Sequence, residues 1–360
     1  MSNQPNHIFD CIVVGAGVLG ASIFFHLTRA GFKVALIEQN TIASGCTAWS
    51  GGVVRCFHQN SQLSDKAIYS WRYYKEFYQH TGQSCSFHTS GFLYFPNQAN
   101  VDATKKETTH LAQLIPIKWL ELDELTELFG HLTYPNKLGA VYEPESGYMS
   151  PVAVTNAWVK AGLEQGGYLF EKTAIQQWQL KEQGGANLHS SDVCFAAKNV
   201  ILAVGASTPS LLEQLGIEHD MYAQVIQVDV RKPATSITNH PAFIDDELDL
   251  NGRPDPERDA IYIGHPTYQR VSTYNELTAP DAQHSALIER IGKTRWRWME
   301  ESSFIQSLRA ADCYTSDGTG RVQPLDGRKG LYVASGFSGG GFKMAPWVGQ
   351  HMVNLVANNI

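Results

Sequence analysis

Apolar runs and glycines alternate in the first part of the chain. Residues 8–14 (IFDCIVV) are a short apolar run with β-branched members, typical of a buried parallel strand. Residues 18–31 (VLGASIFFHLTRAG) have the length of a helix and end on a glycine, as many helices do. Residues 33–38 (KVALIE) form a second apolar run that ends in an acid. The pattern predicts strand, glycine turn, helix and strand.

Two later segments show related patterns. Residues 199–206 (NVILAVGA) predict a buried strand that runs into a glycine. Near the C-terminus, 331–335 (LYVAS) predict another buried strand, 336–342 (GFSGGGF) a glycine-rich loop and 345–359 (APWVGQHMVNLVANN) a helix. A second strand–glycine–helix unit is therefore expected far from the first in the sequence.

Composition narrows the class of protein. The chain has 360 residues, enough for two domains, and its 43% hydrophobic and 18% charged content is that of an ordinary folded protein. Its formal net charge of −7, without a basic run, argues against nucleic acid or an anionic membrane surface as partners. The apolar stretch 11–25 has no cation before it and is too short for a membrane span. We expect a cytoplasmic enzyme with no membrane span.

Cysteine and histidine spacing gives no sign of a metal. The six cysteines are far apart, without a C-x-x-C pair, and the 13 histidines show no ligand spacing. We predict neither a disulfide framework nor a metal site.

The motif GAGVLG, residues 15–20, connects the first strand to the first helix. Gly15 permits a tight turn, Gly17 lets backbone N–H groups approach a pyrophosphate, and Gly20 lets the helix pack closely on the strand. Glu38 would accept hydrogen bonds from a ribose diol. In this context a bound dinucleotide is predicted, the alternative being a packed turn with no ligand.

The C-terminal glycine loop distinguishes FAD from NAD. An NAD enzyme has no evident use for a second glycine loop, whereas a flavin enzyme must hold its isoalloxazine ring as well as its phosphates. The N-terminus of the helix after this loop could face the carbonyl edge of the ring, where negative charge gathers on reduction. FAD is therefore the predicted cofactor.

The sequence resembles the D-amino-acid oxidase superfamily of FAD enzymes, in particular the glycine oxidase and monomeric sarcosine oxidase branch. The stretches that carry the resemblance span the chain: VVGAGVLG, IEQNTIASGCTAWSGGVVR, ESGYMSPVAV, NVILAVGASTPSLL, IYIGHPTY and GLYVASGFSGGGFKMAP. It implies an α/β fold with an α+β substrate part, in which a Rossmann-type FAD-binding domain carries a second, mostly antiparallel β-sheet domain. The β-rich runs GFLYFP, QVIQVDV and AIYIGH agree with the latter. We expect residues 1–85, 146–219 and 306–360 in the FAD-binding domain and 86–145 and 220–305 in the substrate domain.

The resemblance also implies cofactor contacts along the whole chain. The loop 45–52 would wrap the ribityl chain and the pyrophosphate. The full set of expected cofactor-binding residues is Gly15, Gly17, Val18, Leu19, Gly20, Glu38, Gln39, Gly45, Thr47, Ser50, Gly51, Gly52, Ala174, Gly205, Gly339, Gly340, Gly341, Phe342 and Lys343.

The mode of flavin attachment is expected to be noncovalent. Some relatives attach flavin through a histidine in the loop after the ribose-binding acid, but here Trp49 stands at about that place. Others use a cysteine near the C-terminus, where Cys313 lies with one residue too few before Thr315. A cysteinyl bond at Cys313 is the alternative, and otherwise this residue is a plain buried thiol.

The resemblance implies that cations bind a substrate carboxylate over the flavin. Arg55 and Lys343 match the positions that do so in the sarcosine oxidase branch. Tyr262 stands where relatives carry a lysine that speeds the reaction with oxygen, and Gly52 replaces a second arginine. His265 is a candidate polar group on the substrate side. Arg55, Lys343, Tyr262 and His265 are the candidate catalytic residues.

Three functions stay open at this point. The first is an FAD-dependent oxidoreductase that oxidises the C–N bond of a small amino acid or N-methyl amino acid by hydride transfer to flavin. The second is a flavoprotein that modifies a partner protein during tryptophylquinone cofactor biogenesis. The third is an NAD-binding dehydrogenase or a sensor with one glycine motif.

Overall fold

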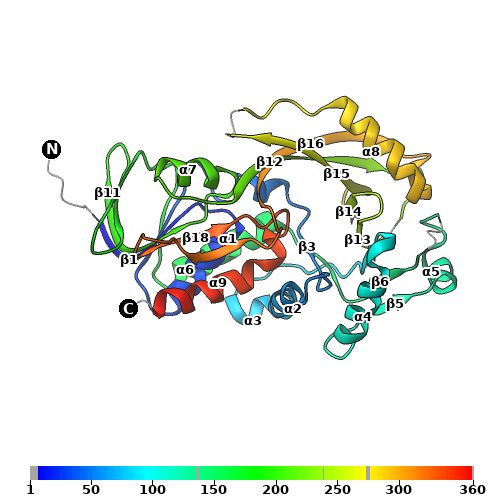
Figure 1. The fold of residues 1–360 in the computed structure, drawn as a ribbon, viewed down its shortest axis with the longest axis horizontal. Coiled ribbons are helices and arrows are strands. Elements are labelled where there is room, and N and C mark those ends of the chain that lie inside the picture. The colour runs from blue at the N-terminus through cyan, green and yellow to red at the C-terminus, as the bar shows by residue number, and fades with distance from the viewer. Residues whose placement is uncertain (1–6, 135–137, 238, 273–275, 359–360) are drawn as a thin grey trace.

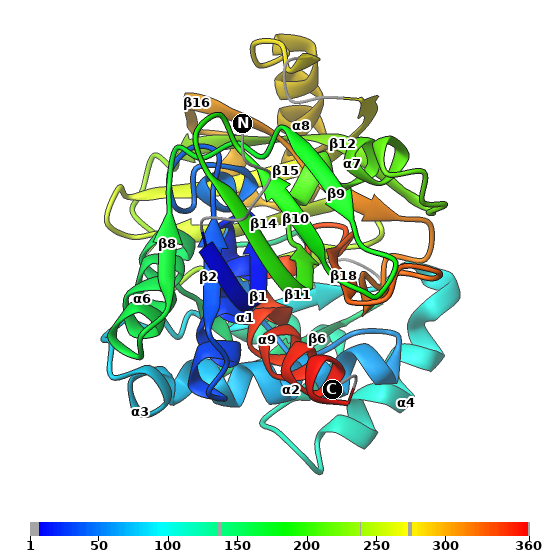
Figure 2. The same ribbon diagram turned by 90° about the vertical axis from the view of Figure 1, so that its left-hand side faces the viewer.

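The computed structural model describes residues 7–134, 138–237, 239–272 and 276–358. Two eight-stranded sheets form separate parts of the molecule, joined by a short two-stranded sheet (Figure 1). The order of the first sheet is β17 (Arg321–Pro324), β18 (Leu331–Ser335), β11 (Cys194–Leu202), β1 (His7–Val14), β2 (Val34–Ile37) and β8 (Tyr168–Phe170), with β10 (Ala186–His189) on β11 and β9 (Gln177–Leu180) on β10. Figure 2 shows β8, β2, β1 and β11 side by side.

The second sheet is mostly antiparallel. Its order is β16 (Ser303–Thr315), β12 (Met221–Lys232), β15 (Ala260–Val271), β14 (Leu250–Asp255), β13 (Ala242–Asp245), β4 (Phe92–Phe95), β6 (Ala140–Glu143) and β5 (Lys118–Leu120). Only β13 and β4 pair in parallel among these described strands. The short sheet pairs β3 (Val53–Val54) with β7 (Gly147–Tyr148).

Helices cover both sheets. Their bounds are α1 (Val18–Arg29), α2 (Ser61–Lys75), α3 (Phe77–Thr81), α4 (Val101–Leu111), α5 (Leu122–Phe129), α6 (Pro151–Glu164), α7 (Thr208–Gln214), α8 (Ala282–Arg295) and α9 (Gly341–Ala357). Short 3₁₀ helices include η1 (Cys46–Trp49) and η3 (Gly205–Ser207). Helix α1 packs against α6 and α9, and α9 against α2.

Alternation along β1 explains why the first sheet is covered on both faces. Cys11 and Val13 belong to the hydrophobic cluster formed with α1, α6 and α9, whereas Ile12 and Val14 belong to a cluster on the other face. Successive side chains of a strand point to opposite faces, and a parallel sheet buried on both sides reads as a continuous apolar run. This is the run from which the strand was predicted.

The structure confirms the predicted α/β fold with a second, mostly antiparallel sheet. One segment differs from the predicted domain division. Strand β16 pairs with β12 along its length, from Lys232 with Ser303 to Met221 with Thr315, so residues 306–315 belong to the second sheet. The sequence alone could not show this, because strand pairing between distant segments is set by tertiary register.

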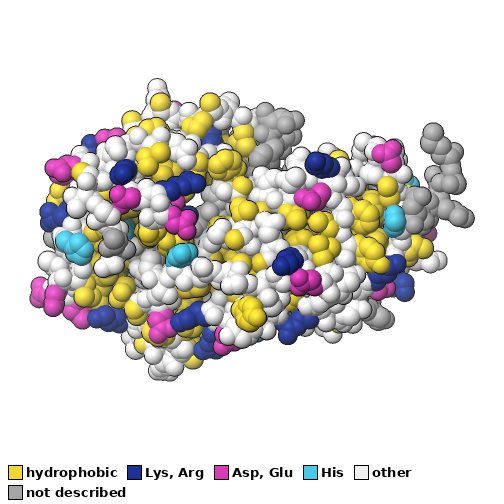
Figure 3. Space-filling view, turned by 180° about the vertical axis from the view of Figure 1, so that it is seen from behind, with side chains coloured by type: hydrophobic (Ala, Val, Ile, Leu, Met, Phe, Trp, Pro, Cys, Tyr) yellow, Lys and Arg dark blue, Asp and Glu magenta, His cyan; other side chains and the backbone are white. Residues whose placement is uncertain are grey.

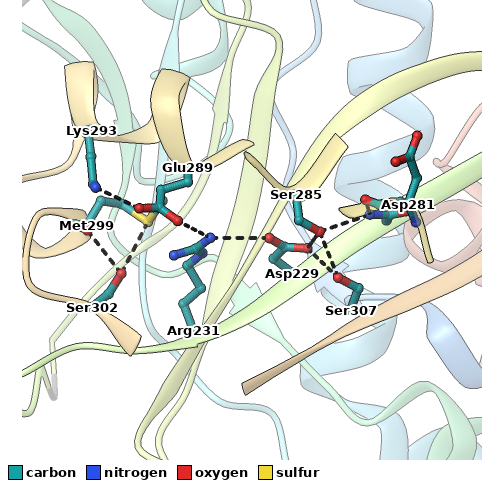
Figure 4. A network of polar contacts seen from close by, with 10 residues as sticks. Asp229, Arg231, Asp281, Ser285, Glu289, Lys293, Met299, Ser302 and Ser307 are labelled. Carbon is teal, nitrogen blue, oxygen red and sulfur yellow. Dashed lines mark hydrogen bonds and ion pairs between the residues drawn. The ribbon is translucent and has the colours of Figure 1, made fainter. Parts of the chain in front are cut away.

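A buried polar network holds α8 against the second sheet (Figure 4). The carboxylate of Asp229 on β12 is fully buried and accepts hydrogen bonds from Ser285 of α8 at 2.8 Å and Ser307 of β16 at 2.7 Å. Arg231, also buried, forms an ion pair with Glu289 of α8 at 2.8 Å. The network fixes the position of the helix through polar contacts that need partners on three elements.

The surface carries mixed charges. Acidic and basic side chains are interspersed on the face seen in Figure 3. Within the described residues, no helix is both long and apolar enough to span a membrane.

Candidate active site

The glycine turn between β1 and α1 has the geometry that phosphate binding needs. Gly15 has φ +102°, and a Cβ there would lie 2.4 Å from the carbonyl oxygen of Ala203. A Cβ at Gly20 would lie 1.9 Å from the oxygen of Gly15, so the helix can approach the strand only with glycine at this position. The predicted tight turn and close packing are therefore present.

The N-terminus of α1 has no side-chain cap from its own N-cap residue. Gly17 is the N-cap and makes no side-chain capping bond, and a Cβ there would meet only Thr47 Oγ1, at 3.3 Å. The same hydroxyl accepts the N–H of Val18 at 3.0 Å. Unpaired N–H groups and the helix dipole at this end suit a pyrophosphate. Leu19 instead turns partly into the core.

Glu38 follows β2 and lies beside this turn. Its carboxylate accepts the N–H of Ala16 and that of Asn40, both at 2.8 Å. The backbone oxygen of Glu38 accepts the N–H of Thr173 at 2.9 Å, which brings the next residue, Ala174, to the same edge. Gln39 is exposed. The structure thus gathers the residues predicted for the ribose end of the cofactor.

The loop 45–52 runs from the α1 turn toward β3. Gly45 is exposed, and Ser50 Oγ accepts the N–H of Gly52 at 3.2 Å. Gly52 has φ +66°, and a Cβ there would lie 2.1 Å from the oxygen of Met149. An arginine at Gly52 would clash with the chain behind it, which is a physical reason for its absence here.

The predicted cofactor-binding glycines of the C-terminal half of the chain lie near the same α1 turn. Gly205 has φ +55° and Gly339 φ +82°, and a Cβ at either would meet open space. Gly341 begins α9 and lies against Leu19, which brings the N-termini of α1 and α9 together. Gly340 adjoins Lys343, because a Cβ at Gly340 would lie 3.1 Å from Lys343 Nζ. These positions fit a dinucleotide with a ring system at its second end.

Phe342 is not brought to this cradle. Its ring is buried and stacks on Tyr74 of α2 at 5.1 Å, and its backbone oxygen accepts the Tyr74 hydroxyl at 2.6 Å. We assign it to the packing of α9 on α2.

Arg55 is held in a buried site. It is 9% exposed, donates from Nη1 to the carbonyl of Phe57, and lies 5.2 Å from the ring centroid of Phe92. Burial lowers its pKa, and the charges of Glu143 and Asp246 oppose that shift. An arginine fork fixed in this way can bind a carboxylate at two points.

Lys343 shares the site with Arg55. Burial lowers the pKa of Lys343 to about 7, and the charge of Arg55 lowers it further, while that of Asp312 raises it. The structure therefore brings together the two cations predicted from distant parts of the sequence. Two neighbouring cations repel each other, and such a pair favours an anion between them.

His58 was not predicted and belongs to the same site. Burial lowers its pKa well below 6.5, as do the charges of Arg55 and Lys343. Its Nδ1 lies 3.1 Å from the carbonyl oxygen of Cys56, so the proton of the neutral ring is on Nδ1 and Nε2 is an acceptor. Two residues separate it from Arg55 in the sequence, but nothing in that spacing indicates a shared site.

Two acids complete the surroundings of the cations. Asp246 accepts a hydrogen bond from Tyr94, which accepts one from Gln59 at 2.6 Å. Asp312 of β16 accepts the N–H of Gly339 at 3.1 Å, and burial raises its pKa. Neither acid was predicted, because each is brought to the site by strand pairing rather than by a local motif.

Cys313 lies on the opposite face of β16 from Asp312. It is 1% exposed, belongs to the hydrophobic cluster on the α7 side of the first sheet, and burial raises its pKa to about 11. These are the surroundings of a plain buried thiol. Trp49 is 42% exposed.

Tyr262 and His265 lie on opposite faces of β15. Tyr262 packs on Arg253, whose guanidinium lies 4.5 Å from its ring centroid. The ring of His265 lies 5.7 Å from that of His284 on α8. The structure thus places His265 on the face covered by α8 and does not bring it to Arg55 and Lys343.

Comparison with known proteins supports this geometry. Residues 10–355 match the family model described as FAD dependent oxidoreductase. The chain is 25% identical to 4-methylaminobutanoate oxidase (formaldehyde-forming) of Paenarthrobacter nicotinovorans over 98% of this chain and 44% of that protein, so it spans less than half the length of this relative. It is 24% identical to glycine oxidase of Geobacillus kaustophilus (strain HTA426), over 97% of this chain and 93% of that one.

The fold is also similar to that of a solved structure. The crystal structure of L-proline dehydrogenase from P. horikoshii matches with a TM-score of 0.87 and 20% identity, covering 99% of this chain and 94% of that one. The family match extends over nearly the whole chain and includes both glycine regions, Arg55 and Lys343. FAD is thereby confirmed as the cofactor, in place of NAD. The chain belongs to the family of FAD-dependent oxidoreductases.

Proposed function

We propose that this protein oxidises the C–N bond of a small amino acid or N-methyl amino acid, such as glycine or sarcosine. The observation that carries this proposal is the pair of cations beside the glycine cradle, of which Arg55 is buried and Lys343 partly buried. Arg55 binds the substrate carboxylate through its guanidinium fork and Lys343 binds it as a point charge.

The chain's own residues orient the substrate in this reaction. A carboxylate held by the two cations places the adjacent C–H and nitrogen at a fixed height over the cofactor. FAD supplies the acceptor of the hydride equivalent, and the resulting imine is hydrolysed by water. The neutral ring of His58 adds no charge to the site, which leaves the cations free to bind an anion.

The relatives support the substrate class. The names 4-methylaminobutanoate oxidase, glycine oxidase and L-proline dehydrogenase each denote a small molecule with a nitrogen and a carboxylate. The surroundings of Cys313 support noncovalent FAD, which acid precipitation would release into the supernatant.

The test is anaerobic reduction of the purified flavoprotein. Glycine, sarcosine, 4-methylaminobutanoate, L-proline and a panel of D- and L-amino acids are mixed with it while the visible flavin bands are followed. At least one of these compounds is expected to bleach the flavin. Arg55→Ala and Lys343→Met should each raise the substrate concentration needed for half-saturation by about 10- to 100-fold. This is the effect expected for the loss of a charge-assisted hydrogen bond.

Lys66→Met is the matched control, because Lys66 lies 4.5 Å from the ring of Trp347 and is not among the charged groups that act on Arg55 or Lys343. It should leave half-saturation unchanged. Flavin that stays oxidised with every compound would overturn the proposal. The alternative of a partner protein modified during quinone-cofactor biogenesis has no support in the relatives above, and it would then be the next hypothesis.

A further inference from the structure

Arg253 is a partly buried cation that no sequence motif identified. It lies on β14, and its guanidinium is 4.6 Å from the ring centroid of Tyr148 on β7 and 4.5 Å from that of Tyr262 on β15. Two aromatic faces on either side of a guanidinium attract it and restrict its movement. The side chain is thus fixed by rings from two different sheets.

The buried nitrogen of this guanidinium lacks a hydrogen-bond partner within the part of the chain that the structure describes. Nη1 donates to the carbonyl of Pro254 at 2.7 Å, whereas Nε is buried and has no hydrogen-bond partner among the described residues. No carboxylate in the described part of the chain forms an ion pair with Arg253. A buried donor without a partner is costly, so Nε points to a group that completes the site when bound.

The position of Arg253 indicates which group this is. A Cβ at Gly51 would lie 4.0 Å from both Cδ and Nε of Arg253. Gly51 lies in the loop 45–52, which contacts the N-terminus of α1 through Thr47. The chain then continues through β3 to Arg55. Between the pyrophosphate end and the carboxylate-binding end, a flavoenzyme holds the isoalloxazine ring. Arg253 therefore faces the stretch of the site that belongs to the ring.

We propose that Arg253 places a fixed positive charge against the isoalloxazine ring and stabilises the negative charge that the ring acquires on reduction. A charge held in a water-poor pocket needs no reorganisation when the ring becomes anionic, so its effect is larger than in water. This role rests on FAD as cofactor but not on the substrate proposed above.

Arg253 is also distinct from the carboxylate-binding pair. The charged and aromatic groups around it are Tyr148, Tyr262, Asp255 and Arg258. Those around Arg55 are Glu143, Asp246 and Tyr94. The two arginines thus lie in different surroundings, Arg253 beside Gly51 and Arg55 on the other side of β3.

The test uses sulfite and the purified holoenzyme, without any substrate. Sulfite donates its sulfur lone pair to flavin N5, forming an S–N bond and leaving the negative charge on the ring. Its dissociation constant, followed at the oxidised flavin band, reports how well the site stabilises that charge. Arg253→Gln should weaken sulfite binding by about tenfold and lower the flavin midpoint potential, whereas Arg253→Lys should retain most of both.

Arg258→Gln is the matched control. Arg258 donates to the Tyr262 hydroxyl at 3.1 Å, and its side chain is 60% exposed. It should change neither quantity. Sulfite affinity and midpoint potential of Arg253→Gln equal to those of the parent protein would overturn the proposal.

A second variant covers the case in which Arg253→Gln does not retain FAD. Tyr148→Leu removes one face of the sandwich and keeps the charge, and it should weaken sulfite binding by a smaller factor. An unchanged sulfite affinity in this variant would count against the proposal. Substrate reduction tests Arg55 and Lys343 separately, so failure of either idea is distinguishable from failure of the other.

Discussion

Lys343 makes carboxylate binding sensitive to pH near neutrality. Its pKa is lowered to about 7, so the ammonium is charged below that pH and neutral above it. Affinity for a carboxylate should be highest below pH 7 and should fall as the pH rises through this value. The dissociation constant of a non-reacting carboxylate, such as acetate, is measured from its effect on the flavin spectrum between pH 6 and 9. A flat profile in the parent protein, or the same slope in Lys343→Met, would contradict this assignment.

Asp312 sets the position of that transition. Its charge raises the pKa of Lys343, so Asp312→Asn should lower this pKa and move the midpoint of acetate binding to a lower pH. The same acetate titration measures the shift. Asp326→Asn serves as the control, because Asp326 is exposed in the loop between β17 and β18, and it should leave the midpoint in place. A midpoint in Asp312→Asn at or above that of the parent protein would argue against this effect of the Asp312 charge.

At the scale of elements, α8 has a polar attachment in addition to the apolar contact of its buried Ile288. Asp229→Ala leaves the Ser285 and Ser307 hydroxyls without their buried acceptor. It also removes the carboxylate that lies 3.6 Å from Arg231, which keeps its ion pair with Glu289. We expect a loss of about 3 kcal/mol in the free energy of unfolding, typical of breaking a buried charged network from one side. Urea unfolding measures it.

Lys293→Ala is the comparison for that experiment. Lys293 pairs with Glu289 on the same helix, and both side chains are more than a third exposed. Its removal should cost no more than about 0.5 kcal/mol. Equal losses for the two variants would show that the network contributes little to holding α8.

Elements with a local signal were predictable from the sequence. The strand, glycine turn and helix around Gly15, Gly17 and Gly20 form one continuous segment, and each glycine has a steric reason that the motif states. The C-terminal unit with Gly339 and Lys343 is of the same kind. Such segments carry most of the cofactor cradle.

Residues brought together by strand register were not predictable. Arg253 lies in a charged, turn-rich stretch, residues 245–259, that is typical of an exposed hairpin or loop. In the structure β14 pairs with β15 and places Arg253 on Tyr262, a contact that this pattern does not indicate. Asp312 reaches Lys343 only because β16 pairs with β12. His265 shows the reverse, since its position on β15 turns it toward α8. A change of one residue in register would exchange the faces of a strand, and no local pattern fixes that.

On the scale of the whole molecule, the cofactor site is closed by both ends of the chain. The α1 turn precedes Val18 and the α9 turn precedes Gly341. All strands of the second sheet lie between these two turns in the sequence. A nascent chain emerging from the ribosome therefore cannot hold FAD in the complete site until α9 has been synthesised. Cofactor capture then acts as a late checkpoint, because only a chain that has completed both sheets presents the two helix ends together.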